Sequence, residues 1–430
     1  MTGQCLWLLL VIGAGLVLSG SPARFVVLRQ AFVANAPFAA SDSSALSADG
    51  RFVTFVSRAR LSSTDTRRIE NIYVFDRAIG TIDLETRTVD GTAADGPSLR
   101  PMLSADGRYL VFSSEATDLL GTADTNACSD IFLRDRGTGT TRRISIGASG
   151  EETNGVSDSP AISDDGNTIA FASRASNLVR GVQRHGVKEI YIARSGTGTP
   201  KLITVSIEAD GRRSVSDSFA PALSGNGNVV AFVSTTAAQA RRAVFVRDLA
   251  LNSAMCITCG MVGDGSYVHS YDPHLDADGQ FVVFTVARER GSGSHPARTD
   301  IAVHDRVSSR AVVITRTANA SSSRARISGN GRFVAFESLA SNLSCNRRCP
   351  AESSDQNLVA DIYLFDRLTA KFTRVSRGGE EWWAPSVGAG LDAEGASIVF
   401  SSRQPIDGND PTSDFDLFIR TLNPPAITRR

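Results

Sequence analysis

A short stretch of the sequence, HSYDPH, combines side chains that bind transition metals. It contains His269, Asp272 and His274, whose imidazole and carboxylate groups are ligands for zinc and similar ions. Such a site needs a further placed ligand, and without one a stretch of this kind is an ordinary polar loop. We keep a metal at His269 and His274 as a hypothesis, and a bound metal would indicate an enzyme.

A second stretch, DTNACSD, spaces oxygen ligands along a loop. Asp124, Asn126 and Asp130 offer the hard ligands that calcium prefers, and DGNDPTSDFD from Asp407 has a similar composition. Neither stretch meets the full pattern of a calcium-binding loop. Calcium is therefore the one cofactor that we keep as a hypothesis, and otherwise we expect none.

Cysteines indicate an oxidising compartment without deciding it. After the first 23 residues the chain has an odd number of them, and two pairs are closely spaced. The two pairs could form a four-thiolate zinc site, but they lie about ninety residues apart and lack the surroundings of a zinc ribbon. We expect local disulfides or plain thiols among Cys128, Cys256, Cys259, Cys345 and Cys349.

A turn of Asp and Gly recurs along the whole chain. In LSADGRYLVFSS, which ends at Ser114, the turn separates a short lead-in from an apolar run. Asp-Gly between apolar runs is typical of a β-hairpin, because Gly readily adopts a positive φ. Seven copies are spaced 52 to 64 residues apart, which makes them an internal repeat. The turn glycines are Gly50, Gly107, Gly166, Gly227, Gly279, Gly331 and Gly395.

Each repeat has room for four short strands. The hairpin is followed by a loop, a third apolar stretch such as DIFLRDR from Asp130, and a last strand such as TTRRISI from Thr140. The stretches are rich in β-branched and aromatic residues and show no helical periodicity. Repeated four-stranded units are typical of a β-propeller. We predict an all-β chain with a single β-propeller of seven blades over residues 24–430.

The two ends of the chain predict how the ring closes. RFVVLRQ, from Arg24, is a strand without a repeat of its own, whereas the seventh repeat has only three strands. We therefore expect the N-terminal strand to complete the last blade, which leaves no open sheet edge. Six blades are the alternative, because the seventh turn is Glu394-Gly395.

The repeat resembles the WD40-like repeats of TolB-type propellers. The shared frame is LS-x-DG followed by an apolar strand ending F-x-S, and then D-I-[YF] with D-R at the strand end, as in DIYLFDR from Asp361. The resemblance covers residues 24–430 and is specific to the fold. It implies an exported protein that binds partners without catalysis.

Polar residues that recur in the repeat have a structural explanation. Asp at the end of the third strand can accept amides of the next turn, and the following Arg can lie across the sheet. An element present in four repeats is architecture rather than a local site. The pairs are Asp76-Arg77, Asp135-Arg136, Asp305-Arg306 and Asp366-Arg367.

Binding residues are expected where the repeats differ. In a propeller the Asp-Gly turns and the turns after Asp-Arg share one face, which we call the turn face. The opposite face, which we call the long-loop face, carries long irregular connections such as residues 147–160 and 173–189. Loops on a rigid scaffold concentrate binding residues, so we predict that ligands bind the long-loop face.

Acidic and aromatic residues are candidates on that face. Four Asp residues stand near the start of the innermost strands, where a partial ring of carboxylates could attract a cation or a basic peptide. The alternative is that each caps its own turn. Glu380-Glu381-Trp382-Trp383 adds an exposed aromatic contact or, alternatively, a ring that covers a blade. The ligand-binding candidates are Asp42, Asp158, Asp217, Asp272, Trp382 and Trp383.

Together these features predict an exported, non-catalytic scaffold that binds a protein or other ligand around the central channel. The expected partner is a protein or peptide, or else a carbohydrate. The alternative is a metal-assisted propeller enzyme, a lyase or hydrolase acting on carbohydrate. We assign no catalytic residue, because the Gly-x-Ser-x-Gly motif and the sialidase Asp box are both absent.

The N-terminus and the charge balance predict where the protein works. An apolar run from Leu6 to Leu18 is short for a membrane span and ends in small residues near Ala23. We predict a signal peptide over residues 1–23, no membrane span after its cleavage, and a periplasmic or extracellular protein. An uncleaved anchor is the alternative, because no Lys or Arg precedes the run. Basic and acidic residues balance at 45 each, which argues against a nucleic-acid partner.

Overall fold

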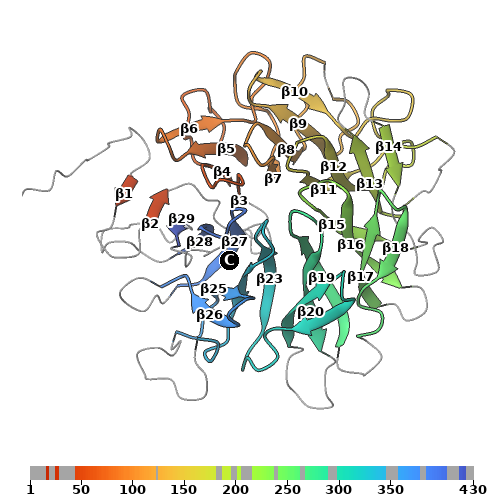
Figure 1. The fold of residues 1–430 in the computed structure, drawn as a ribbon. Helices are drawn as coiled ribbons and strands as arrows, with labels where there is room; N and C mark the ends of the chain where they lie inside the picture. Colours follow the sequence, from red (N-terminus) through yellow and green to blue (C-terminus); the bar gives the residue numbers. More distant parts are fainter. Residues whose placement is uncertain are drawn as a thin grey trace, which may run out of the picture.

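Short antiparallel strands joined by turns and loops make up the described chain, and the computed structural model contains no helix among the residues that it describes. Seven sheets stand around a central channel as the blades of a propeller (Figure 1). The predicted seven-bladed β-propeller is therefore confirmed, and the alternative of six blades is wrong. The structure describes residues 16–18, 25–28, 44–122, 124–180, 186–194, 201–204, 216–236, 241–261, 267–288, 298–344, 357–377, 384–403 and 416–422.

Blades 1 to 6 each contain four consecutive antiparallel strands, ordered from the channel outward. Blade 1 contains β3 (Ser44–Leu46), β4 (Phe52–Ser57), β5 (Asn71–Asp76) and β6 (Thr81–Leu84), and blade 2 contains β7 (Ser98–Leu103), β8 (Tyr109–Ser114), β9 (Asp130–Asp135) and β10 (Thr140–Arg143). Blade 3 contains β11 (Ser157–Ile162), β12 (Thr168–Ser173), β13 (Glu189–Arg194) and β14 (Lys201–Thr204), and blade 4 contains β15 (Ser218–Leu223), β16 (Val229–Thr236), β17 (Arg241–Asp248) and β18 (Ser253–Cys256).

Blades 5 and 6 follow the same order, and blade 7 borrows its outer strand from the N-terminus. Blade 5 contains β19 (Tyr267–Leu275), β20 (Phe281–Arg288), β21 (Thr299–Asp305) and β22 (Arg310–Val313), and blade 6 contains β23 (Ser322–Ile327), β24 (Phe333–Ser338), β25 (Asp361–Asp366) and β26 (Lys371–Arg374). Blade 7 contains β27 (Ser386–Leu391), β28 (Ser397–Ser402) and β29 (Asp416–Thr421), followed outward by β2 (Phe25–Leu28) and β1 (Leu16–Leu18).

The Asp-Gly turns are held by their own side chains. In blade 2 the Ser104 hydroxyl donates to Asp106 Oδ1 at 2.6 Å and accepts the Tyr109 amide at 2.9 Å. Gly107 has a φ of 68°, which favours glycine, and a Cβ there would meet Phe52 of blade 1. All seven turn glycines have a positive φ, so the predicted structural role of these turns is confirmed.

A closed ring of backbone hydrogen bonds joins the seven turns. The Ala48 amide in blade 1 donates to the Ala105 carbonyl in blade 2 at 2.9 Å, and the Ala393 amide in blade 7 donates back to Ala48 at 3.0 Å. These bonds fix every blade to its neighbour at the turn-face end of the channel. The other five run from Ala105 to Asp164, Asp164 to Gly225, Asn226 to Ala277, Ala277 to Gly329 and Asn330 to Ala393.

The hydrophobic core lies between the blades. Seven buried clusters each combine side chains of two consecutive blades, so that every interface in the ring is filled. At the closing interface, Phe55 and Tyr73 of blade 1 pack with Val399 and Leu417 of blade 7. Burying these faces against one another is what a single blade could not achieve alone.

The N-terminal strand closes the ring, as predicted. β2 pairs with β29 in antiparallel register, with Phe25 opposite Arg420 and Leu28 opposite Leu417. β1 then adds a fifth strand beside β2. The predicted signal peptide, residues 1–23, otherwise lies outside the described residues. The described part of the chain contains no helix long and apolar enough to cross a membrane.

Closure by β2 yields a testable prediction. Removing residues 1–30 deletes β2, exposes the edge of β29 and lowers the free energy of unfolding by about 3 kcal/mol or more, with aggregation. Removing residues 1–23 deletes β1 but keeps β2, and leaves the free energy of unfolding nearly unchanged. Urea denaturation followed by circular dichroism measures both variants. Equal stability of the two variants would contradict closure by this strand.

Candidate functional site

The innermost strands enclose a cavity of about 250 Å³ along the channel. Near the turn face the wall is made of small residues such as Ala48, Ala105 and Ala393. The next layer is aliphatic in every blade, and polar side chains line the channel nearer the start of the strands. The aliphatic layer consists of Leu46, Leu103, Ile162, Leu223, Leu275, Ile327 and Leu391.

A β-bulge in the innermost strand creates the polar layer. Blades 2 to 7 all show the bulge, which lies two residues after the start of the strand in every one of them except blade 5, where the strand begins earlier. The first residue of the bulge has a positive φ, which re-aims its side chain. In blade 7 this residue is a glycine, Gly388. A proline follows in blades 2 to 5, as in Pro101 and Pro273, where an amide would have no ladder partner. The other bulge residues are Arg100, Ser159, Ala220, Asp272 and Arg324.

The channel mouth, which we define as Arg100, Ser159, Ala220 and Asp272, is thus set by the bulges on the side of the long-loop face. These four residues line the cavity together with Arg326. Arg100 has a side chain that is 42% exposed and lies 3.7 Å from Asp158. The mouth therefore offers both a cation and an anion above an aliphatic wall, which suits a ligand with polar groups and an apolar part.

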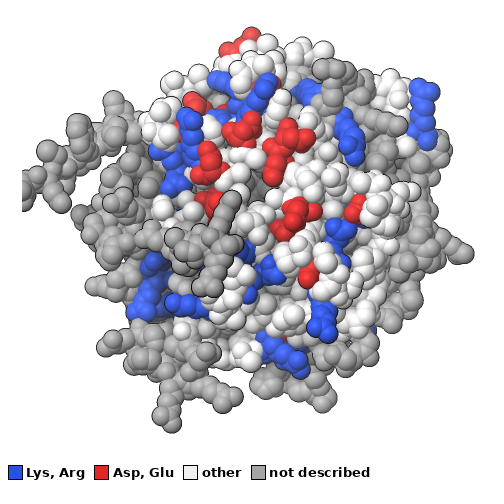
Figure 2. Space-filling model, viewed as in Figure 1, with Lys and Arg blue, Asp and Glu red and all other residues white. Residues whose placement is uncertain are grey.

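The carboxylates of the predicted ring do not gather at one site in the structure. Asp158 pairs with Lys188 Nζ at 2.5 Å, and Asp217 pairs with Arg174 at 2.6 Å. Asp272 alone of the three described candidates lines the cavity, whereas Asp42 lies outside the described residues. Figure 2 shows acidic and basic side chains interspersed around the middle of the drawn face.

The second metal candidate is already occupied by an arginine. Arg143 is buried and lies 3.1 Å from Asp124 and 3.5 Å from both Asp130 and Glu152. Asn126 turns its amide nitrogen, not its oxygen, toward Asp130 at 3.0 Å. The guanidinium stands where a calcium ion would neutralise these acids, so the described arrangement does not fit calcium.

The two candidate histidines have separate environments. His269 Nδ1 accepts the Arg242 amide at 3.2 Å, and its ring lies against Tyr271. His274 lines the cavity, and its Nδ1 accepts the Ile327 amide at 3.4 Å. Burial and the nearby Arg326 lower the pKa of His274 to about 3, so the imidazole is neutral. Among the described residues, no three His, Cys, Asp or Glu side chains gather to hold a metal.

Two further sequence predictions have different outcomes. Trp382 and Trp383 lie outside the described residues. The Asp-Arg pairs are structural, as predicted: Asp135 accepts the Gly137 amide at 2.9 Å, and Arg136 donates to the Gly107 carbonyl of its own turn at 2.7 Å. Arg136 also reaches Glu85 of blade 1 at 2.6 Å, which ties two blades together.

Sequence reasoning missed the basic residues of the channel. Arg100 was detectable, because it stands directly before the strand proline, as Asp272 does in blade 5. Arg326 gave no such signal, because its place in the channel depends on the bulge two residues earlier.

Asp276 was also missed, although the repeat marks it. It stands where five other blades have the turn serine, and its carboxylate accepts the Phe281 amide at 2.9 Å. Burial, together with the neighbouring Asp278, raises the pKa of Asp276 to about 7. Asp392 occupies the same position in blade 7, and burial raises the pKa of its carboxyl as well.

Comparisons with known proteins identify the fold and no family. No protein-family model and no curated protein matches the sequence. An oligogalacturonate lyase in complex with manganese is 12% identical over 96% of this chain and 97% of its own, with a TM-score of 0.56.

Two further solved structures are similar. The oligogalacturonate lyase of Vibrio parahaemolyticus is 9% identical over 96% of this chain and 98% of its own, with a TM-score of 0.58. The β-propeller domain of the Trilobed protease from Pyrococcus furiosus is 12% identical over 90% and 94%, with a TM-score of 0.52. These likenesses confirm the predicted propeller at the level of the fold.

The raised pKa of Asp276 predicts a pH-dependent stability. The folded protein retains a proton that the unfolded chain releases between about pH 4 and pH 7, so stability falls as pH rises through this range. Asp276→Ser removes the effect and makes the loss between about pH 5 and pH 8 smaller by on the order of 1–2 kcal/mol. Urea denaturation at both pH values measures the difference.

The control is Glu115→Ser, which removes an exposed carboxylate beside the end of β8. This variant should keep the pH dependence of the parent protein. The assignment would be contradicted if the free energy of unfolding changed by the same amount between the two pH values in the parent protein and in Asp276→Ser.

Proposed function

We propose that the protein is an exported scaffold that binds a protein or other ligand through the long-loop face around the central channel, without catalysis. The observation that supports this most is the channel mouth, where Arg100 and Asp272 border an open cavity with aliphatic walls. A cavity with a polar rim and apolar walls favours the capture of one end or side chain of a larger ligand.

The charge arrangement favours a polar ligand rather than a simple cation. Asp158 and Asp217 already have cationic partners, so the long-loop face presents paired charges. A partly exposed arginine that contacts a carboxylate of its own chain can instead bind a carboxylate of a ligand. A peptide or a sugar carries the donors and acceptors that such a rim requires. Trp382 and Trp383, which lie outside the described residues, stay candidates for aromatic contacts with such a ligand.

Two features support export. The apolar N-terminal run has the length of a signal peptide core rather than of a membrane span. The disulfide between Cys256 and Cys259 fits an oxidising compartment. Together they favour a periplasmic or extracellular location for the propeller.

The second candidate function is a metal-assisted lyase or hydrolase acting on carbohydrate. It is favoured by the likeness in fold to two oligogalacturonate lyases, one of them in complex with manganese. Asp276, with a pKa of about 7, lines the same cavity as the neutral His274 and would suit proton transfer. The described residues do not supply a metal-ligand set, so such a site would need ligands from outside them.

Two arginines of blade 2 provide a matched test of the scaffold. Arg100 lies at the channel mouth, whereas Arg108 lies at the turn face, and both are about half exposed and paired with an aspartate. A binder is first isolated by cross-linking in the native envelope, and its dissociation constant is then measured by calorimetry. Arg100→Ala weakens binding about tenfold, and Arg108→Ala leaves it unchanged.

Binding that depends on Arg108 and not on Arg100 would contradict a site on the long-loop face. Metal analysis of the purified protein separates the two functions. A stoichiometric ion that is lost in His274→Ala would contradict the pure scaffold and favour the enzyme.

A further inference from the structure

In five blades of the described chain, a buried hydroxyl just after the outermost strand is tied to the third strand. In blade 1 the Thr86 hydroxyl accepts the amide of Ile72 at 3.1 Å. Five blades show this bond in the described residues, with distances from 2.8 to 3.1 Å. The five hydroxyl residues are Thr86, Ser145, Thr258, Thr315 and Ser376.

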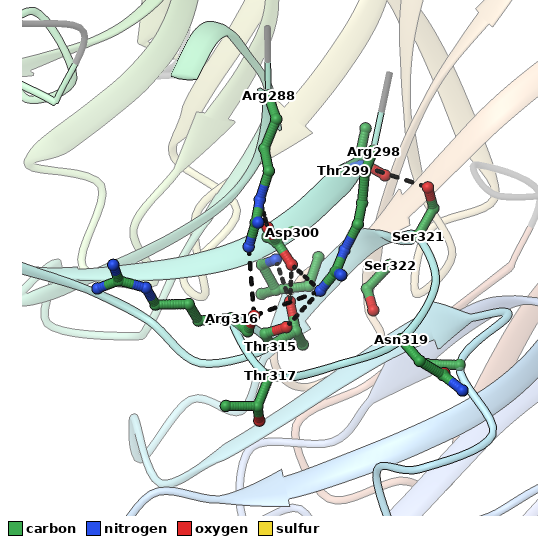
Figure 3. Close-up of polar contacts among 12 residues, drawn as sticks. Arg288, Arg298, Thr299, Asp300, Thr315, Arg316, Thr317, Asn319, Ser321 and Ser322 are labelled. Carbon is green, nitrogen blue, oxygen red and sulfur yellow. Dashed lines mark hydrogen bonds and ion pairs between the residues drawn. The ribbon is translucent and has the colours of Figure 1, made fainter. Parts of the chain in front are cut away.

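In four of these blades, the tie is completed by the third-strand residue that directly precedes the bonded amide. The hydroxyl donates its own proton to that side chain, as from Thr86 to Asn71 at 2.9 Å and from Thr315 to Asp300 at 3.2 Å. Arg288 and Arg298 also contact Asp300, at 2.7 and 3.2 Å (Figure 3). The equivalent acceptors are Asp130 in blade 2 and Asp361 in blade 6.

Blade 4 lacks this acceptor. Its third-strand residue is Ala243, which is buried opposite Ser234 as Asn71 is opposite Ser57 in blade 1. The Thr258 hydroxyl still accepts the Val244 amide at 2.9 Å, but a methyl group cannot accept its proton.

A disulfide stands at the same place instead. Cys256 and Cys259 are bonded to each other and bracket Ile257 and Thr258, the two residues that anchor β18. The Ile257 amide donates to the Val244 carbonyl at 3.0 Å, and the Cys259 amide donates to Cys256 Sγ at 3.0 Å. Of the five ties, the one without a side-chain acceptor is therefore the one held by a covalent bond.

We propose that the Cys256–Cys259 disulfide is a reversible redox site that replaces the missing acceptor of blade 4. While it is oxidised, it holds Ile257 and Thr258 against β17. Its reduction releases this tie and loosens β18, while the other blades keep theirs. This property does not depend on the proposed scaffold function. β19, which carries Asp272 to the channel mouth, follows β18 along the chain.

The exchange is chemically accessible. Cys259 is exposed and Cys256 is half-buried, so a thiol reductant can reach the bond from solvent. A reductant thiolate attacks one sulfur and expels the other as a thiolate, which takes up a proton. The second thiol of the reductant then resolves the mixed disulfide. The protein gains two thiols, and the dithiol becomes a disulfide. Because the closed loop is very short, the bond acts on local native structure more than on the unfolded chain.

The first experiment uses the full chain without any substitution. Hydrogen exchange is followed by mass spectrometry, with and without dithiothreitol, for peptides that cover 253–261 in blade 4 and 371–376 in blade 6. Reduction speeds exchange of the Ile257 amide at least tenfold and leaves the blade 6 peptide unchanged. Unchanged exchange in blade 4, or equal acceleration in both blades, would overturn the proposal.

A rescue experiment then tests the replacement itself. The double variant Cys256→Ser, Cys259→Ser should exchange at residue 257 as the reduced protein does. Adding Ala243→Asn supplies the neutral acceptor that Asn71 provides in blade 1, and should slow this exchange about tenfold. Ala254→Asn, placed on β18 away from Thr258, is the matched control and should not rescue. Rescue by neither substitution would show that the disulfide does not stand in for an acceptor.

Discussion

The ring of backbone hydrogen bonds between the seven Asp-Gly turns is the constraint on which the rest of the structure depends. Each bond joins two blades through main-chain atoms, so the turn must present its carbonyl and amide at the same height in every repeat. Glycine at a positive φ and a short hydroxyl or carboxylate side chain satisfy this requirement. The ring therefore explains why the turn sequence repeats.

This constraint makes the two ends of the channel different. At the turn face, the bonded turns bring small residues together and leave little freedom for substitution. Toward the long-loop face, the bulges interrupt the ladder of the innermost strands of blades 2 to 7, and in blades 2 to 6 each bulge re-aims one side chain. Arg100 and Asp272 differ in charge although their backbones match, because the bulge fixes the main chain and leaves the side chain to vary. The cavity is thus a place where variation costs the fold little.

The sequence predicted what the repeat encodes and failed where side chains from separate loops meet. Seven turns gave the blade count, and the unpaired strand after Arg24 gave the closure. The predicted ring of carboxylates assumed equivalent positions before the strand prolines, but Asp158, Asp217 and Asp272 occupy three different positions relative to the bulge. Their partners Arg174 and Lys188 come from a long connection and its end, whose path the repeat does not determine. The contact of Arg143 with Asp124 was not predicted either, because Arg143 belongs to β10 and Asp124 to a separate loop.

Departures from the repeat are more informative than the repeat itself, because the other blades serve as internal references. Asp276 in place of serine buries a carboxyl whose raised pKa costs stability at neutral pH, and a purely structural turn has no need of it. Ala243 in place of an acid or amide removes a tie that a neighbouring disulfide restores. Both departures lie in blades 4 and 5, on either side of the connection between β18 and β19. The strand that carries Asp272 and His274 into the channel is thus flanked by two departures from the repeat, and any specific activity of this propeller is best sought along that strand.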